Sequence, residues 1–231
     1  MSCSKLLGCV LAVCTQTVWA ADVRVKSKYT ASGQTTESVM YSNGVRQRFE
    51  YGDVAIINQC DLRRLVQVND KAKLYALTST GARAQAPAEA QPRKGGVVTY
   101  TASVTETGEK KQMFGHAARR LKTLMVKEPG SGACDTRAER VETDGWYIDV
   151  PTPLTCASTH QADSVPPAGG CSDEIQHKTN GADAAGYALE YTMNSPAVQD
   201  RPAVSMHMQV LEFSTDPIPA AMFDVPAGYR E

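Results

Sequence analysis

Apolar and polar residues alternate along most of this chain, and this period constrains the fold more than any other feature. In DVRVKSKYT, Val23, Val25 and Tyr29 lie on one side of an extended chain, and charged residues lie on the other. Successive side chains of a β-strand point to opposite faces, so this period is typical of a strand with one buried face. The same alternation recurs as far as AVSMHMQVLEF near the C-terminus. We therefore expect a mainly β protein.

Short polar turns separate these expected strands. Asn43-Gly44 is a hairpin signal because both residues readily adopt positive φ angles, and a second turn is expected at residues 107–109. VAIINQC, RLVQVN and KLYALTS follow one another with polar tripeptides between them. Ile56 and Ile57 point to opposite faces, which predicts a central strand. Together these segments predict an antiparallel meander.

Two segments interrupt the alternation. Residues 80–96 carry almost no large apolar side chain, which predicts a flexible excursion. Residues 151–186 are rich in proline and glycine and contain two cysteines, which predicts a loop pinned by a disulfide. A short helical turn is expected after Pro217. With these interruptions, residues 21–231 are expected to form a single β-rich domain.

The segment KKQMFGHAARRLKTLMV, residues 110–126, is compatible with two structures. Its apolar residues Met113, Ala117 and Leu121 recur at helical spacing. Gly115 lies in the middle and argues against a helix. The residues alone leave the choice between strand and helix open.

The first 20 residues are organised like a secretory signal peptide. Lys5 precedes a short apolar run, and small or β-branched residues precede Ala21. The run is shorter than the roughly 20 residues that span a bilayer, and no longer apolar run follows. We expect cleavage after Ala20, a periplasmic or secreted protein, and no transmembrane segment. A lipoprotein anchor is disfavoured because Cys9 leaves almost no hydrophobic core before it and Cys14 follows a bulky valine.

Four cysteines lie beyond that segment, and an even number in an exported chain predicts disulfides. They are Cys60, Cys134, Cys156 and Cys171. The Cys-x3-His and Cys-x5-His spacing within residues 156–177 also fits a zinc site, but an oxidising compartment favours disulfides over thiolate ligands. Four cysteines allow three pairings. Because Cys134 and Cys156 flank one expected strand, chain reach favours Cys156 with Cys171 and leaves Cys60 with Cys134.

Composition and motifs argue against several functions. A formal net charge of −1 gives no electrostatic footprint for nucleic acid. The sequence has no phosphate-binding loop, no dinucleotide fingerprint and no Gly-x-Ser-x-Gly nucleophile turn. Asp173 and Glu174 are adjacent and point apart on an extended chain, so they do not form a catalytic carboxylate pair. We therefore expect no enzymatic activity, no cofactor and no metal.

Several segments resemble one family. They are LEFSTDPIPAAMFDVPAGYR, QCDLRRLVQVNDKAKLYAL, TGEKKQMFGHAARRLKT, DGWYIDV and CSDEIQHKTNGADAAGYAL. They are similar to segments of exported bacterial proteins of unknown function, whose sheets are similar to the outer-membrane lipoprotein carrier (LolA-like) superfamily. The resemblance implies a strongly curved antiparallel sheet, an incomplete barrel, with a short helix or loop near its open side. It also implies that residues 110–126 are strand, with Gly115 at a bend.

In the carrier proteins of that superfamily the concave face of the sheet holds acyl chains. The resemblance therefore implies a lipid or another hydrophobic molecule as the partner of this chain. Methionine thioethers adapt to varied apolar ligands, and a tryptophan can stack on one. The candidate ligand-binding residues are Phe49, Tyr51, Ile56, Trp146, Met206 and Met208. The alternative is a structural or protein-interaction module of the cell envelope, without a small-molecule site, in which these side chains only pack the core.

Overall fold

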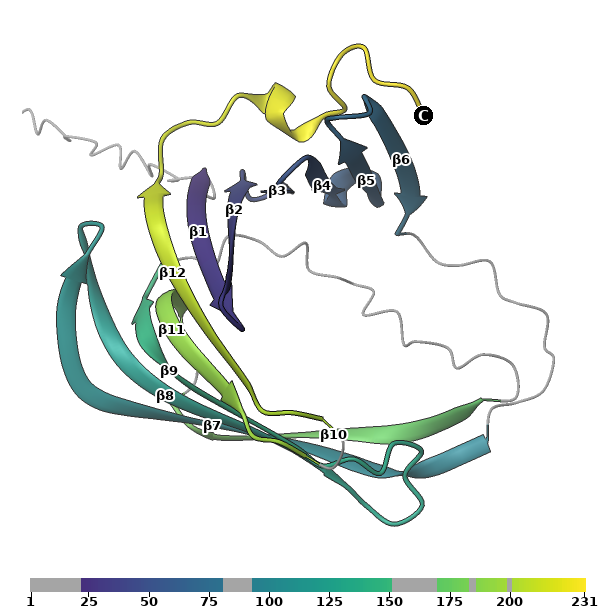
Figure 1. Cartoon of the computed structure of the whole chain (residues 1–231), viewed down its shortest axis with the longest axis vertical. Coiled ribbons are helices and arrows are strands. Elements are labelled where there is room, and N and C mark those ends of the chain that lie inside the picture. The colour runs from purple at the N-terminus through teal and green to yellow at the C-terminus, as the bar shows by residue number, and fades with distance from the viewer. Residues whose placement is uncertain (1–21, 81–92, 151–169, 183–185, 199–200) are drawn as a thin grey trace, which may run out of the picture.

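A computed structural model shows a single, strongly bent sheet (Figure 1). The structure describes residues 22–80, 93–150, 170–182, 186–198 and 201–231. The N-terminal strands are β1 (Val23–Ala31), β2 (Gln34–Ser42), β3 (Arg46–Tyr51), β4 (Val54–Gln59), β5 (Arg64–Asn69) and β6 (Leu74–Ser79). The later strands are β7 (Arg93–Met113), β8 (His116–Pro129), β9 (Glu139–Ile148), β10 (Cys171–Gly181), β11 (Tyr187–Ser195) and β12 (Val204–Ser214). Two short 3-10 helices, η1 (Cys60–Leu62) and η2 (Ala220–Phe223), complete the described elements.

The 12 strands form one sheet in the order β10-β7-β8-β9-β11-β12-β1-β2-β3-β4-β5-β6. The first and last strands pair with each other near its middle, and all named pairs are antiparallel except β10 with β7. The sheet bends until β6 and β10 lie at opposite ends of an open curve (Figure 1). The expectation of a mainly β, strongly curved and incomplete barrel is confirmed.

Strands β1 to β6 form the expected meander. The Asn43 carboxamide oxygen accepts hydrogen bonds from the backbone N–H groups of Val45 and Arg46, and Gly44 has a φ of 82°, so the chain turns where Asn-Gly predicts. Strand β4 lies between β3 and β5, as a central strand should. Its Ile57 is 0% exposed, whereas Ile56 on the opposite face is half-buried.

Residues 110–126 are strand, and the helical spacing in this segment is misleading. Strands β7 and β8 meet at a two-residue hairpin turn in which Phe114 and Gly115 have φ angles of 50° and 79°. Two positive φ angles are what the favoured hairpin turns require. The prediction of a turn at residues 107–109 is wrong. These residues form a bulge inside β7, where the pairing with β8 shifts between Glu106 and Lys110.

Two expected loops are shorter than predicted. Strand β7 already begins at Arg93, so the last part of the 80–96 excursion is strand, and residues 81–92 lie outside the described part. The pinned loop at 151–186 contains β10, and residues 151–169 lie outside the described part. Strand β10 is mostly polar and pairs in parallel with β7, so its own sequence shows no alternation. The expected signal peptide, residues 1–20, also lies outside the described residues.

A disulfide joins Cys134 to Cys171, so both pairings favoured by chain reach are wrong. Parallel pairing places Cys171 opposite Arg93, at the start of β7. The loop containing Cys134 crosses the same place, where a side chain on Gly96 would collide with the backbone of Ala133. Cys60 is also disulfide-bonded, and Cys156 lies outside the described residues.

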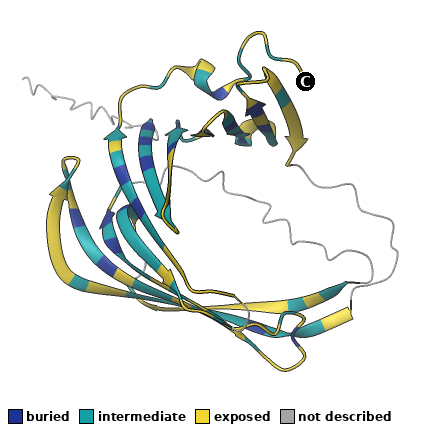
Figure 2. Ribbon diagram, viewed as in Figure 1, coloured by how far each residue is buried: buried dark blue, intermediate teal, exposed yellow. Residues whose placement is uncertain are grey.

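Two apolar clusters stabilise the sheet (Figure 2). The larger consists of Val23, Val25, Ala118, Ile148, Leu189, Met208 and Val210, which come from β1, β8, β9, β11 and β12. The smaller consists of Ala55, Ile57, Val66, Val68 and Phe223, so η2 packs on β4 and β5. The expected helical turn after Pro217 is thus confirmed and closes one face of the meander. No helix in the described part is long and apolar enough to cross a membrane.

Candidate functional site

Register places five of the six candidate ligand-binding residues on one face of the sheet. Residues directly opposite each other in a ladder share a face. Val25 lies opposite Met40, Met40 opposite Phe49, and Phe49 opposite Ile56. Tyr51 follows Phe49 by two residues and shares its face, and the two rings lie 5.9 Å apart.

Strand β12 adds the two methionines to the same face. Tyr29 lies opposite Met208, and Ala31 lies opposite Met206. Met208 belongs to the larger core cluster and is 5% exposed, whereas Met206 is half-buried. We call Phe49, Tyr51, Ile56, Met206 and Met208 the apolar face.

The C-terminal segment leaves this apolar face uncovered at β4. Phe223 packs with Ala55 and Ile57, which alternate with Ile56 along the strand. The helix η2 therefore lies on the other face of the meander. Phe49, Ile56 and Met206 belong to neither core cluster and are half-buried, and Tyr51 is 39% exposed.

Trp146 is in register with polar residues rather than with the other five, although it packs against the larger core cluster that contains Met208. It lies opposite Glu190, and Glu190 lies opposite Gln209, which alternates with Met208 along β12. This register places the indole beside Glu190, and the ammonium group of Lys111 lies 4.2 Å from its ring centre. This contact is a cation–π interaction, and it holds the indole beside a polar surface.

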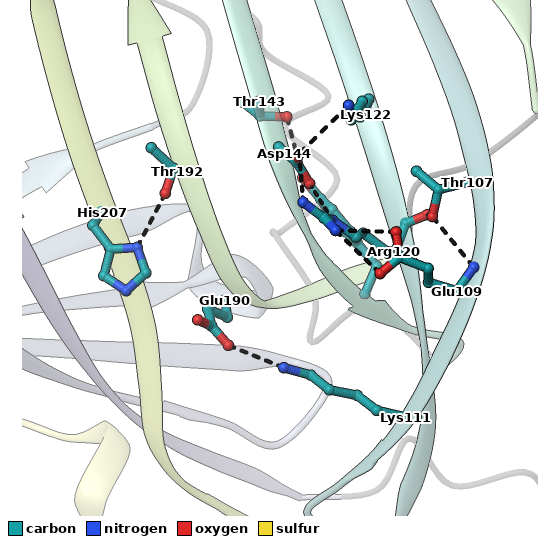
Figure 3. Close-up of polar contacts among 11 residues, drawn as sticks. Thr107, Glu109, Lys111, Arg120, Lys122, Thr143, Asp144, Glu190, Thr192 and His207 are labelled. Carbon is teal, nitrogen blue, oxygen red and sulfur yellow. Dashed lines mark hydrogen bonds and ion pairs between the residues drawn. The ribbon is translucent and has the colours of Figure 1, made fainter.

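That polar surface is built around Arg120 (Figure 3). Its guanidinium donates two hydrogen bonds to the Asp144 carboxylate, at 2.7 and 2.9 Å, in the fork geometry that strengthens such pairs. The same group donates to both carboxylate oxygens of Glu109, at 3.0 and 3.1 Å. Lys122 Nζ lies 3.8 Å from Asp144. We call Glu109, Arg120, Lys122 and Asp144 the arginine network.

The β7 bulge positions one member of this network. Thr107 donates a hydrogen bond from its hydroxyl to the Arg120 carbonyl at 3.2 Å, and the same hydroxyl oxygen accepts one from the Glu109 backbone N–H at 3.3 Å. The extra residues of the bulge bring the Glu109 carboxylate to Arg120 on the neighbouring strand. Hydrogen bonding to Arg120 lowers the pKa of Asp144, and hydrogen bonding to Asp144 and Glu109 raises the pKa of Arg120. Both groups therefore stay charged at neutral pH.

Two adjoining open hollows flank the arginine network, with volumes of about 410 and 340 Å³. The first is lined by hydroxyl and amide side chains, including Ser103, Thr105, Thr143 and Asn194. The second includes Trp146, Glu190 and His207. His207 shares a hydrogen bond with Thr192 at 3.3 Å, and Lys111 contacts Glu190 at 3.3 Å. The surface is a set of mutually paired charges, which is typical of a stabilising network rather than of a proton-transfer site.

The sequence analysis did not anticipate the arginine network. On their strands Arg120 and Asp144 lie at the same period-two positions as the polar Lys122 and Glu142 but also as the buried Ala118 and Ile148, so the alternation does not assign them to a polar surface. Their pairing depends on the register between β8 and β9, in which Arg120 lies opposite Trp146 and Lys122 lies opposite Asp144. No local signal in the sequence specifies that register.

The donor atoms of Cys134, Cys171 and Asp173 gather within 4.8 Å of one another. The two sulfur atoms are joined in a disulfide and are therefore not thiolate ligands. Asp173 accepts hydrogen bonds from the backbone N–H groups of Cys134 and Gly96, at 2.7 and 3.1 Å. The carboxylate thus fastens the loop to β7. Of the zinc ligands considered above, His177 stacks on Tyr100 with ring centres 5.7 Å apart, and residues 156 and 160 lie outside the described part.

Comparisons with known proteins give only distant likenesses. No family model and no curated protein sequence matches this chain. A structure of PNGF-II aligns over 92% of this chain with a TM-score of 0.38 and 8% identity, and this chain covers 31% of that protein's length. A structure of a DUF1329 family protein from Desulfovibrio piger ATCC 29098 aligns over 90% of this chain and 91% of its own, with a TM-score of 0.30 and 8% identity. Likenesses at this level carry no argument about function.

Proposed function

We propose that this chain is an exported, non-enzymatic protein that binds a lipid or another hydrophobic molecule on the apolar face of its sheet. The supporting observation is that Phe49 and Ile56 lie directly opposite each other on β3 and β4, and that Met206, further along the sheet on β12, shares their face. In the described part of the chain the C-terminal segment packs on the opposite face of the meander. Apolar side chains on an uncovered face of a sheet favour the binding of an apolar ligand.

The chemistry of these side chains suits an acyl chain. Methionine has no branching and a polarizable sulfur, so Met206 adapts to a flexible hydrocarbon. Phe49 and Tyr51 provide flat apolar surfaces next to each other. An ionised headgroup would lie at the solvent-exposed margin of the face, where Tyr51 is partly exposed.

Native mass spectrometry of the protein, purified from its own host without detergent, tests the proposal directly. We expect a population that carries an additional mass, which tandem fragmentation releases as a lipid. Recovery of the ligand-free mass alone from such material would contradict the proposal.

Titration with the fluorescent fatty acid cis-parinaric acid locates the site. Phe49→Gln and Met206→Gln should each weaken binding by roughly tenfold, because burial of one large apolar side chain contributes about 1.5 kcal/mol or more. Ile175→Gln is the matched control, since Ile175 is 49% exposed on β10, far along the sheet from β3. Thermal melts monitored by circular dichroism show whether each variant folds. Equal affinities for all three folded variants would place the ligand elsewhere.

A further inference from the structure

The two edge strands of the sheet, β6 and β10, differ in whether another part of the described chain pairs with their outer side. At the β6 edge the backbone N–H of Tyr75 donates to the Arg230 carbonyl at 2.8 Å, and the Arg230 N–H donates to the Lys73 carbonyl at 3.1 Å. The C-terminus thereby occupies part of that edge. At the other end no described strand pairs with the outer side of β10. An open edge of 11 residues offers unpaired backbone groups to another strand.

Strand β10 is held firmly enough to present that edge. The Cys134–Cys171 disulfide and the Asp173 carboxylate fasten its beginning, and the stack of His177 on Tyr100 fastens its middle. From Glu174 onward every residue of β10 is exposed. The outer edge is therefore both ordered and accessible within the described structure.

We propose that two copies of this chain pair antiparallel through β10, with Gln176 opposite the partner's Gln176. A two-fold axis perpendicular to the sheet relates the copies and keeps each face continuous across the junction. In this register Glu174 lies opposite the partner's Lys178, and Lys178 lies opposite the partner's Glu174. Two cross-strand ion pairs thus flank the central pair on the same face.

Neighbouring registers lack this complementarity. Pairing centred on Ile175 places Glu174 opposite the partner's Gln176, and pairing centred on His177 places Lys178 opposite the partner's Gln176. Pairing centred on Glu174 or on Lys178 brings like charges together, which is destabilising in directly opposed positions. The charge pattern of β10 therefore selects one register among those that a two-fold axis allows.

The charges on β10 are otherwise unused. No ion pair within the described part of the chain involves Glu174 or Lys178, although Gln176 donates a hydrogen bond to Glu174 at 3.2 Å. Edge charges also serve to prevent pairing with foreign strands. A self-complementary pattern combines the two effects, because it disfavours most strands and favours a second copy of the same one.

Analytical ultracentrifugation of the full chain with its disulfides intact, from micromolar to millimolar concentration, tests this dimer. The interface is at the small end of stable interfaces, so we expect a concentration-dependent monomer–dimer equilibrium. Glu174→Lys and Lys178→Glu should each raise the dimer dissociation constant by roughly tenfold or more, because two attractive pairs become repulsive. The double reversal, Glu174→Lys with Lys178→Glu, should restore dimerisation.

Lys71→Glu is the matched control, since Lys71 is exposed in the turn after β5 and should leave the equilibrium unchanged. Cysteine crosslinking provides an independent measurement. Gln176→Cys should form a covalent dimer under a mild oxidant such as copper phenanthroline, whereas Asn180→Cys should not, because four residues separate it from the centre. A monomer at every concentration, failure of the double reversal to restore dimerisation, or equal crosslinking of both cysteine variants would overturn the proposal.

Discussion

At the scale of single residues, Arg120 does more than any other side chain to join the polar sides of neighbouring strands. It projects from β8 and bonds to Asp144 on β9 and Glu109 on β7. A planar guanidinium can serve both carboxylates at once because its donors form a rigid fork. Lysine at this position would keep the charge and lose the two-oxygen geometry. The network therefore adds register-specific bonds between β7, β8 and β9.

Replacement of Asp144 by asparagine should destabilise the protein in a pH-dependent way. At pH 7 we expect Asp144→Asn to lower the free energy of unfolding by about 0.5–1 kcal/mol, since both partners are about a third exposed and water screens the pair. Arg120 lowers the pKa of Asp144, so the native ion pair stabilises above the unfolded pKa of about 4 and is lost as the pH falls through the lowered folded pKa. The difference between wild type and variant should therefore shrink below about pH 4.

Urea unfolding at pH 7 and at pH 3 measures both effects. Glu142→Gln is the control, because Glu142 pairs with Arg140 only two residues away and both side chains are half exposed. A difference for Asp144→Asn that is constant from pH 7 to pH 3 would contradict the ionic origin of the effect.

At the scale of elements, β10 owes its place to anchors rather than to apolar burial. Its residues are mostly polar, and its pairing with β7 is the one parallel pairing between named strands of the described sheet. The bond between Cys134 and Cys171 closes a span of 37 residues. A crosslink of this size restricts the unfolded chain by about 3–4 kcal/mol in the chain-entropy account.

Removal of this disulfide should loosen β10 selectively. The double variant Cys134→Ser with Cys171→Ser should lose about 3 kcal/mol of unfolding free energy. Amide hydrogen exchange should rise more in β10 and at the start of β7 than in β1 to β5, because local opening begins where few contacts remain. Uniform acceleration over the entire sheet would show that the bond stabilises the molecule globally instead.

At the scale of the whole molecule, the two core clusters lie on opposite faces of the meander and join distant parts of the chain. The smaller cluster buries Phe223 completely against β4 and β5, so the C-terminal segment acts as a cover for the N-terminal strands. The Gln59 side chain reinforces this contact by donating to the Phe223 carbonyl at 2.7 Å. One face of the meander is thus closed, and the candidate ligand face is the other.

Truncation of Phe223 should release this cover. Phe223→Ala should cost about 3–5 kcal/mol, the usual range for a buried aromatic side chain. Limited proteolysis should then cut within residues 215–231 before any other described segment. Ala221→Gly, two residues before Phe223 and exposed, is the control and should leave the cleavage pattern as in the wild type. First cleavage elsewhere in the Phe223→Ala variant would contradict this assignment.

The sequence predicted what depends on neighbouring residues and missed what depends on register. Asn43-Gly44 specifies its own turn, and the alternation in β1 and β12 specifies which residues face the core. Strand β10 was not predicted, because it pairs in parallel with β7 and its own sequence shows no alternation of apolar and polar residues. The Cys134–Cys171 bond was not predicted either, since only that pairing brings the two sulfurs together.

The candidate site shows the same contrast between features that depend on alternation and features that depend on register. Five of its six residues share a face because period-two alternation held on β3, β4 and β12, whereas Trp146 is in register with Glu190. That register depends on the pairing of β9 with β11, which shifts between Ala188 and Glu190. The arginine network joins residues 11 and 24 positions apart in the sequence, and only the three-dimensional pairing makes them neighbours.

The pairing of β1 with β12 has a consequence for biosynthesis. Strand β1 is synthesised before the other named strands and pairs with β2 on one edge. Its other edge stays unpaired until β12 has been synthesised. Contacts of such long sequence separation slow folding and leave the nascent polypeptide vulnerable to aggregation. A circular permutant in which residues 215–231 and a linker connect β12 to β1 would bring these strands closer in sequence and keep the C-terminal cover, and it should refold faster than the natural order.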